Sequence, residues 1–171
     1  QFLLRPAEFL YTTYATYTTA FTLGDISFIV NCVEIPAIHL LPQHVPSKVG
    51  FLFTKQKNEV SGDRVWLQAA PPGHSRTCPV CCAARRCRDL LQHPNPASTP
   101  LFTYRIGTGY RQITSRTVTH LLRIHALASH PHISISAASL RATGATAYLA
   151  GKAPDTLIKL IGRWRSDEVF R

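Results

Sequence analysis

Prolines divide this chain of 171 residues into short blocks, and this limits its fold more than any other feature. Three clusters fall at residues 36–46, 71–72 and 94–100. Proline lacks a backbone N–H and clashes with the preceding turn of a helix, so neither a long helix nor a central strand crosses such a cluster. Because 45% of the residues are hydrophobic, the blocks between the clusters can still bury a core. We therefore expect a single domain, residues 1–171, built from short elements.

The strand patterns lie in the first half of the chain. Residues 21–33 and 49–54 are rich in β-branched and aromatic side chains, and residues 64–67 form a third such run. The polar residues between the last two runs include two lysines and end in Ser-Gly-Asp, which predicts a β-hairpin with lysines at its tip. We expect a three-stranded antiparallel sheet, with a proline-rich loop over residues 34–48.

Helical patterns occupy most of the remaining chain. Val118, Leu121, Leu122 and His125 fall at i, i+3, i+4 and i+7, which predicts a helix with this stripe facing a core. Gly162 is a typical helix end. The predicted fold class is therefore mainly α with a small antiparallel β-sheet, an α+β fold. Helices are expected at about 6–20, 78–92, from 114 onward, 136–151, 154–162 and from 166 onward.

Positive charge is concentrated in the middle of the chain. Lysine and arginine number 19 against 9 acidic residues, for a net charge of +10. Residues 48–123 alone contain twelve of the basic residues and three of the acids. This balance is typical of proteins that bind a polyanion such as double-stranded DNA, although a solvated basic face is the alternative. No run of about 18 uncharged apolar residues exists, so we expect no membrane partner.

The most specific motifs lie in the last third of the chain. They are Ser139-Leu140-Arg141 and, further along, Gly162-Arg163-Trp164-Arg165-Ser166-Asp167; near the start stands Leu3-Leu4-Arg5-Pro6-Ala7-Glu8. In their order along the chain, these three motifs resemble the conserved boxes of tyrosine recombinases, the family of the phage integrases. The Gly-Arg-Trp-x-Ser-Asp form is similar to that of Crypton and DIRS mobile elements and of related algal and protist integrase-like proteins. The resemblance implies the catalytic core of a DNA breaking and rejoining enzyme.

This resemblance implies a chemistry that suits the residues quoted. A tyrosine attacks a phosphodiester, and the resulting phosphotyrosyl bond is later attacked by another strand end. Arg5 and Arg141 would hold the scissile phosphate, because guanidinium groups bind its oxygens bidentately and stay charged. Lys55 would protonate the leaving 5′-oxygen as general acid, with Lys57 as the second choice. Trp164 stands where the family has His or Trp, and its indole N–H can donate to a phosphate oxygen.

The remaining assignments concern DNA contacts outside the reacting centre. Lys57, Arg163 and Arg165 would bind the DNA backbone, and neither a metal nor a cofactor is implied. Each assignment has a structural alternative. Arg5 would pair with Glu8, the two lysines would be ordinary surface residues of a turn, and Trp164 would anchor a core.

The chain departs from the family pattern at three places. Ala138 stands where the family usually has His, three positions before the second arginine. By spacing from Gly162, the nucleophilic tyrosine is expected directly after Arg171, so the nucleophile helix is incomplete. The N-terminal DNA-clamping domain is expected to be missing, since the chain opens inside the first box. We therefore expect a fragment truncated at both ends, and the alternative to an enzyme is a non-catalytic DNA-binding remnant of a mobile-element recombinase.

Assembly and location follow from the same reading. The resemblance implies dimers or tetramers on DNA for the full-length protein, and we expect a monomer off DNA. Five cysteines, four of them within residues 78–87, do not form the framework of a secreted disulfide protein. This usage indicates an intracellular protein, nuclear in a eukaryotic host. A zinc site is disfavoured, because Cys81, Cys82 and Cys87 would lie on one helix rather than in two spaced pairs.

Overall fold

The computed structural model describes residues 3–10, 20–54, 62–130, 132 and 134–164. These residues form a mixed α+β fold with five α-helices and a four-stranded antiparallel sheet, which confirms the expected class. The chain divides into two compact units, residues 7–113 and residues 1–6 with 114–171. We call these the sheet unit and the helical unit and describe each by itself.

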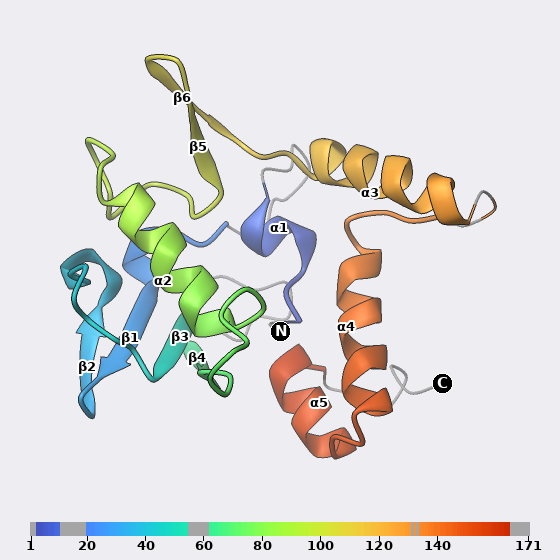
Figure 1. Cartoon of the computed structure of the whole chain (residues 1–171), viewed down its shortest axis with the longest axis horizontal. Coiled ribbons are helices and arrows are strands. Elements are labelled where there is room, and N and C mark those ends of the chain that lie inside the picture. Colours follow the sequence, from blue (N-terminus) through green and yellow to red (C-terminus); the bar gives the residue numbers. More distant parts are fainter. Residues whose placement is uncertain (1–2, 11–19, 55–61, 131, 133, 165–171) are drawn as a thin grey trace. The chain divides into compact units, whose positions relative to one another are not determined.

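The sheet unit contains four antiparallel strands in the order β2-β1-β3-β4 (Figure 1). The hairpin of β3 and β4 confirms the prediction, with Phe53 opposite Asp63; residues 55–61 lie outside the described residues. The strands are β1 (Ile26–Val30), β2 (Val33–Pro36), β3 (Lys48–Phe53) and β4 (Asp63–Gln68).

The prediction of three strands was wrong because the run 21–33 contains a tight turn. Asn31 and Cys32 both have positive φ, at 51° and 66°, as a two-residue hairpin turn of type I′ requires. The chain therefore reverses and continues as β2, inside the segment expected to be a loop. Pro36 ends β2 at the edge of the sheet, where its missing N–H breaks no ladder bond.

Helix α2 (Pro79–Leu90) packs on β3 and β4 and starts with proline in its first turn, as predicted. Its buried face consists of small and aliphatic side chains, whereas its arginines lie on the other faces. Phe21 meets Phe51 and Phe53 edge to face, with ring centroids 5.1 and 4.8 Å apart. These aromatic contacts close the core beneath the sheet.

Shorter elements complete the chain before residue 114. Helix α1 begins at Pro6 as expected, and all of it after Pro6 belongs to the sheet unit. Residues 11–19 of the helix predicted there lie outside the described residues. A second hairpin, formed by β5 and β6, turns at Gly107, whose φ is 56°, and the strand patterns did not indicate it. The bounds are α1 (Pro6–Phe9), η1 (Leu23–Asp25), η2 (Ala37–His39), β5 (Thr103–Ile106) and β6 (Gly109–Gln112).

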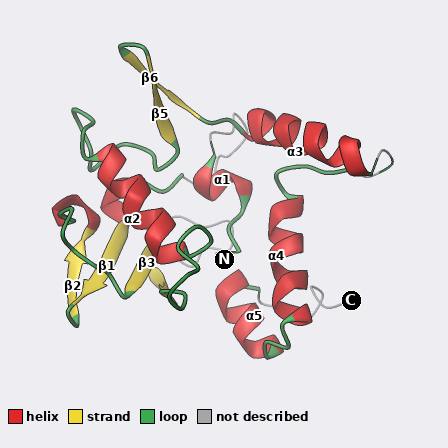
Figure 2. Cartoon of the chain, in the orientation of Figure 1, coloured by secondary structure: helices red, strands yellow, loops and turns green. Residues whose placement is uncertain are grey.

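The helical unit consists of α3 (Ser115–Ser129), α4 (Ser139–Ala150) and α5 (Asp155–Gly162) (Figure 2). Helix α4 packs against α5, and Leu3, Ala145, Ile158 and Ile161 form their buried cluster. Tyr148, Ala153 and Trp164 pack around this cluster. The small residues Gly144 and Ala145 are buried, as expected for a helix whose small side chains allow close packing.

Helix α3 corrects one prediction. Thr114 caps it as expected, with its hydroxyl accepting the Thr117 N–H at 3.1 Å. The stripe from Val118 to His125 does not face a core, because no residue of α3 is buried and Leu121 is 51% exposed. The buried hydrophobic cluster of this unit is formed by residues of α4 and α5 together with Leu3. Within the described residues, no helix is long and apolar enough to span a bilayer.

Candidate functional site

Arg141 and Trp164 lie together in the helical unit, although they are 23 positions apart in the sequence. Arg141 belongs to the first turn of α4, and Trp164 follows the end of α5. The guanidinium carbon lies 4.6 Å from the centroid of the indole ring. One Nη2 hydrogen of Arg141 is donated to the Gly162 carbonyl. The indole therefore contacts the face of this half-buried guanidinium, and the Gly162 carbonyl contacts its edge.

The end of α5 explains how Trp164 reaches this position. Arg163 has left-handed backbone angles, φ 54° and ψ 41°. Its N–H donates to the Leu160 carbonyl at 3.3 Å, and the Trp164 N–H donates to the Lys159 carbonyl at 3.1 Å. These two bonds form a Schellman motif, which stops the helix and turns the chain back along it. The helix ends at Gly162 as predicted, but the left-handed residue is Arg163 rather than glycine.

Gly162 is required by the indole rather than by its own backbone angles. A Cβ at this position would overlap the six-membered ring of Trp164. Only glycine therefore lets the ring lie directly on the last turn of α5. The three residues of this motif thus differ in what they contribute: Gly162 allows the close approach, Arg163 stops the helix, and Trp164 contacts Arg141.

Trp164 also packs against the buried cluster of the helical unit. Trp164 therefore packs at the edge of a core, as its structural alternative expected, and also contacts Arg141. The core fixes the ring, and the ring and the Gly162 carbonyl orient the arginine. A guanidinium positioned in this way needs less ordering when it binds a planar anion.

The other residues singled out from the sequence are half-buried, exposed or outside the described residues. Arg5 lies in the helical unit, half-buried, two positions after Leu3 of the buried cluster. Arg163 is half-buried at the helix stop. Ala138 is exposed one turn before Arg141, and its carbonyl accepts the Arg141 N–H at 3.2 Å. The candidates outside the described residues are Lys55, Lys57 and Arg165.

The helical unit is strongly basic. Its described residues include one acid, Asp155 at the start of α5, and seven basic residues. A single carboxylate cannot neutralise this charge, so the surface of this unit carries a positive potential that attracts anions. The basic residues are Arg5, Arg116, Arg123, Arg141, Lys152, Lys159 and Arg163.

Several arginines counted in the basic stretch 48–123 bond to backbone carbonyls, some of them half-buried, such as Arg86, and some exposed, such as Arg123. Arg86 Nε donates to the Leu101 carbonyl at 2.6 Å, and Arg123 Nε donates to the Ile135 carbonyl at 3.1 Å. Burial lowers the pKa of Arg86, and the nearby Asp89 partly offsets this effect. Part of the charge therefore serves the fold, which the residue count did not reveal.

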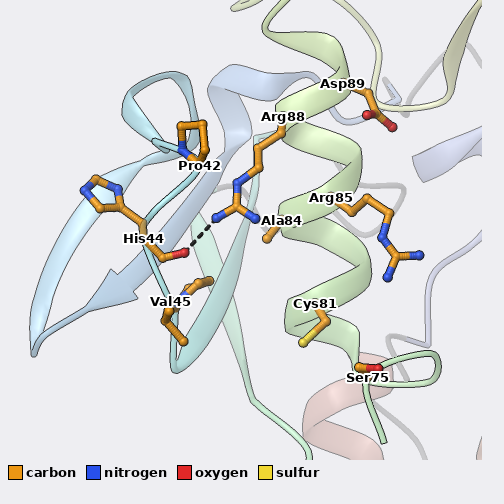
Figure 3. Close-up of a pocket in the computed structure, with 10 residues that line it drawn as sticks. Pro42, His44, Val45, Ser75, Cys81, Ala84, Arg85, Arg88 and Asp89 are labelled. Atoms are coloured by element: carbon orange, nitrogen blue, oxygen red, sulfur yellow. Dashed lines mark hydrogen bonds between the residues drawn. The ribbon is translucent and has the colours of Figure 1, made fainter.

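A cavity of about 480 Å³ lies between the loop 42–46 and α2 in the sheet unit (Figure 3). Arg88 links α2 to this loop by donating to the carbonyls of Leu41 at 3.1 Å and His44 at 2.7 Å. Cys81 and Arg85 also line it. No sequence pattern indicated this cavity, because its loop wall was assigned no structure of its own.

The cysteines form no metal site in the part of the chain that the structure describes, where no group of three or more His, Cys, Asp or Glu side chains is placed to hold an ion. Cys78 is the N-cap of α2, and Cys87 is buried in its inner face. Burial raises the pKa of the Cys87 thiol to about 12, which opposes the thiolate form that zinc requires.

Comparisons with protein-family models, with curated proteins and with solved structures found no match for this chain.

Proposed function

We propose that this chain is the catalytic core of a tyrosine recombinase that cleaves and rejoins double-stranded DNA through a phosphotyrosyl intermediate. The observation that carries the proposal is the placement of Arg141 between the Trp164 ring and the Gly162 carbonyl. The residues in contact are those of the two motifs that carry the resemblance. The contacts thus link two sequence motifs into one site in a strongly basic unit.

The proposed role of Arg141 is to bind the scissile phosphate. Its guanidinium is a planar fork of N–H donors that stays protonated at every physiological pH. Negative charge on the phosphate oxygens grows in the transition state, so donors that are already oriented stabilise it most. The indole and the Gly162 carbonyl supply that orientation, and the indole N–H of Trp164 is a second candidate donor.

The remaining roles follow the resemblance. Arg5 would bind the same phosphate as Arg141, and Lys55 would protonate the leaving 5′-oxygen, with Lys57 as the second choice. Arg163 and Arg165 would contact the adjoining backbone. The nucleophile would be a tyrosine directly after Arg171. The proposed partner is double-stranded DNA, inside the cell.

A second candidate function is DNA binding without cleavage. The exposed methyl group of Ala138 favours it, because no proton can be transferred at that position. Both functions require the phosphate contact of Arg141, and they differ in whether a covalent intermediate forms.

The phosphate contact can be tested by DNA binding as a function of salt. We would titrate a fluorescent random-sequence duplex with the wild-type chain and with Arg141→Ala at several salt concentrations. Arg116→Ala is the matched control, because it removes the same charge from an exposed position on α3 of the same unit. We expect Arg141→Ala to make the negative slope of log K against log salt shallower by about 1 and the control to leave the slope unchanged. A slope that Arg141→Ala leaves unchanged would contradict a phosphate contact at Arg141.

Cleavage requires a separate experiment. Sequencing the source locus past codon 171 shows whether a tyrosine follows. If it does, the extended protein incubated with a random-sequence duplex pool and then digested with nuclease and protease should yield a peptide carrying a phosphotyrosyl nucleotide. The extended protein with that tyrosine changed to phenylalanine is the control. DNA binding without any adduct would support the non-catalytic function instead.

A further inference from the structure

Two cysteines, Cys78 and Cys81, lie at the start of α2 in the sheet unit. Cys78 is the N-cap residue and is 1% exposed, whereas Cys81, in the first turn, is exposed. The Cys78 sulfur accepts the backbone N–H of Cys81 at 3.5 Å and that of Ala70 at 3.3 Å. The two cysteines are therefore neighbours in a Cys-x-x-Cys arrangement at a helix N-terminus.

The surroundings distinguish the two thiols. Burial raises the pKa of Cys78, but the hydrogen bonds from Cys81 and Ala70 outweigh burial, so that its pKa is lowered overall. The interaction with the Cys78 side chain is the main cause that raises the pKa of Cys81, and burial adds to it. Cys78 is consequently the more acidic of the two thiols.

Access to the pair is through Cys81. This residue lines the cavity between the loop 42–46 and α2, together with Arg85 and Arg88 (Figure 3). Two guanidinium groups beside an accessible thiol suit a small anionic disulfide, whose carboxylates they would attract. The neighbouring Cys82 is oriented differently, since its thiol donates to the Arg76 carbonyl at 3.3 Å. Cys87 is buried within the helix face and has no such access.

We propose that Cys78 and Cys81 form a redox-active dithiol that glutathione disulfide, or a small anionic disulfide of the same class, oxidises to an intramolecular disulfide. In the first step the Cys81 thiol loses its proton to solvent and the resulting thiolate attacks one sulfur of glutathione disulfide, which forms a mixed disulfide on Cys81 and releases one glutathione as a thiolate that takes up a proton. In the second step the Cys78 thiol loses its proton, and its thiolate attacks the Cys81 sulfur and displaces the second glutathione, which is protonated in turn. The two cysteines lose two electrons and two protons, and one glutathione disulfide becomes two glutathione molecules.

Oxidation would weaken the hydrogen bonds that the Cys78 sulfur accepts from the backbone N–H groups of Ala70 and Cys81. A disulfide sulfur carries no charge, so it accepts the Ala70 and Cys81 N–H groups more weakly than a thiolate does. Ala70 lies just past the end of β4 (Asp63–Gln68), and Cys81 lies in α2. We therefore expect faster hydrogen exchange at these two amides in the oxidised chain, while amides in the middle of α2 keep their protection.

The test incubates the purified chain in glutathione buffers of increasing oxidised fraction, blocks remaining thiols with an alkylating reagent and maps the peptides by mass spectrometry. Wild type should lose two hydrogens and yield one linked peptide containing Cys78 and Cys81. Cys82→Ser is the matched control and should form the same link, whereas Cys81→Ser should form none. Cys78→Ser should stop at the mixed disulfide on Cys81.

Three outcomes would overturn the proposal. They are a link between Cys81 and Cys82, a wild-type chain that stays at the mixed disulfide, and a wild-type chain that remains fully reduced in pure glutathione disulfide. Because Cys81 and Cys82 are both exposed, their variants test the proposal even if Cys78→Ser fails to fold. No DNA is present in this experiment, so its result does not depend on the proposed recombinase function.

Discussion

Gly162→Ala tests whether the indole of Trp164 determines the residue at the end of α5. The new methyl group would overlap the ring, so the ring must move off the helix and away from Arg141. Displacing a packed ring costs about 1–3 kcal/mol, a range that includes the cation–π contact, worth about 0.5–2 kcal/mol. Alanine in place of glycine in a helix stabilises the folded state by about 1 kcal/mol. We expect a net loss of about 0–2 kcal/mol in the free energy of unfolding.

The assay is urea unfolding followed by the helical circular dichroism signal, because it does not depend on tryptophan fluorescence. The control is the same substitution in a Trp164→Ala background, where the methyl group has nothing to meet. There Gly162→Ala should be neutral or stabilising by up to about 1 kcal/mol, since only the helix preference remains. The difference between the two backgrounds is the coupling energy of the pair. An equal loss in both backgrounds would refute the role assigned to the ring.

Three further predictions concern single contacts. The pKa of Cys87 rises from 9.0 to about 12 on folding, so stability should be intact below pH 9 and fall by about 1.4 kcal/mol per unit toward pH 12, less steeply in Cys87→Ala. Arg88→Ala should cost about 1–3 kcal/mol in urea unfolding, because it removes two bonds to loop carbonyls, whereas Arg85→Ala on the same helix should change little. Thr114→Ala should cost about 1 kcal/mol and speed hydrogen exchange in α3; unchanged exchange there would contradict its role as cap.

Most elements of the fold could be predicted because they depend on local signals. Proline at the start of α2, the Thr114 cap of α3 and the polar turn between β3 and β4 each act within a few residues. The turn at Asn31 and Cys32 was missed because cysteine is unusual at positive φ, and only the asparagine was a signal. The second hairpin was missed because β5 and β6 are largely exposed and show no buried alternation.

Burial was less predictable than secondary structure. The apolar stripe of α3 has the helical period, but a period states only that one face is apolar. It does not state which element covers that face. Leu3 is a second example of burial that the sequence pattern did not predict, because a residue near the start of the chain completes a cluster made by α4 and α5. Such contacts between distant segments have no local signature.

The candidate site could be predicted in its residues but not in its geometry. The motifs singled out Arg141 and Trp164, yet no spacing rule states that the guanidinium stacks on the indole or that the Gly162 carbonyl accepts from it. Arg163 runs against local preference, since glycine is the usual left-handed residue at a helix end. The charge count, in turn, could not separate arginines that bond to carbonyls, such as Arg86, from those that face solvent.

The two ends of α5 also restrict how long this helix can be. Pro154 precedes its first residue, and the left-handed Arg163 follows its last one, so neither end can slide to absorb a change in length. One inserted residue would rotate everything after it by about 100° and carry the indole away from the α4 side. Four inserted residues would restore the angle to within about 40° but shift the ring by about 6 Å along the axis. Insertions and deletions should therefore be excluded from residues 155–162, whereas substitutions on the exposed face of α5 remain acceptable.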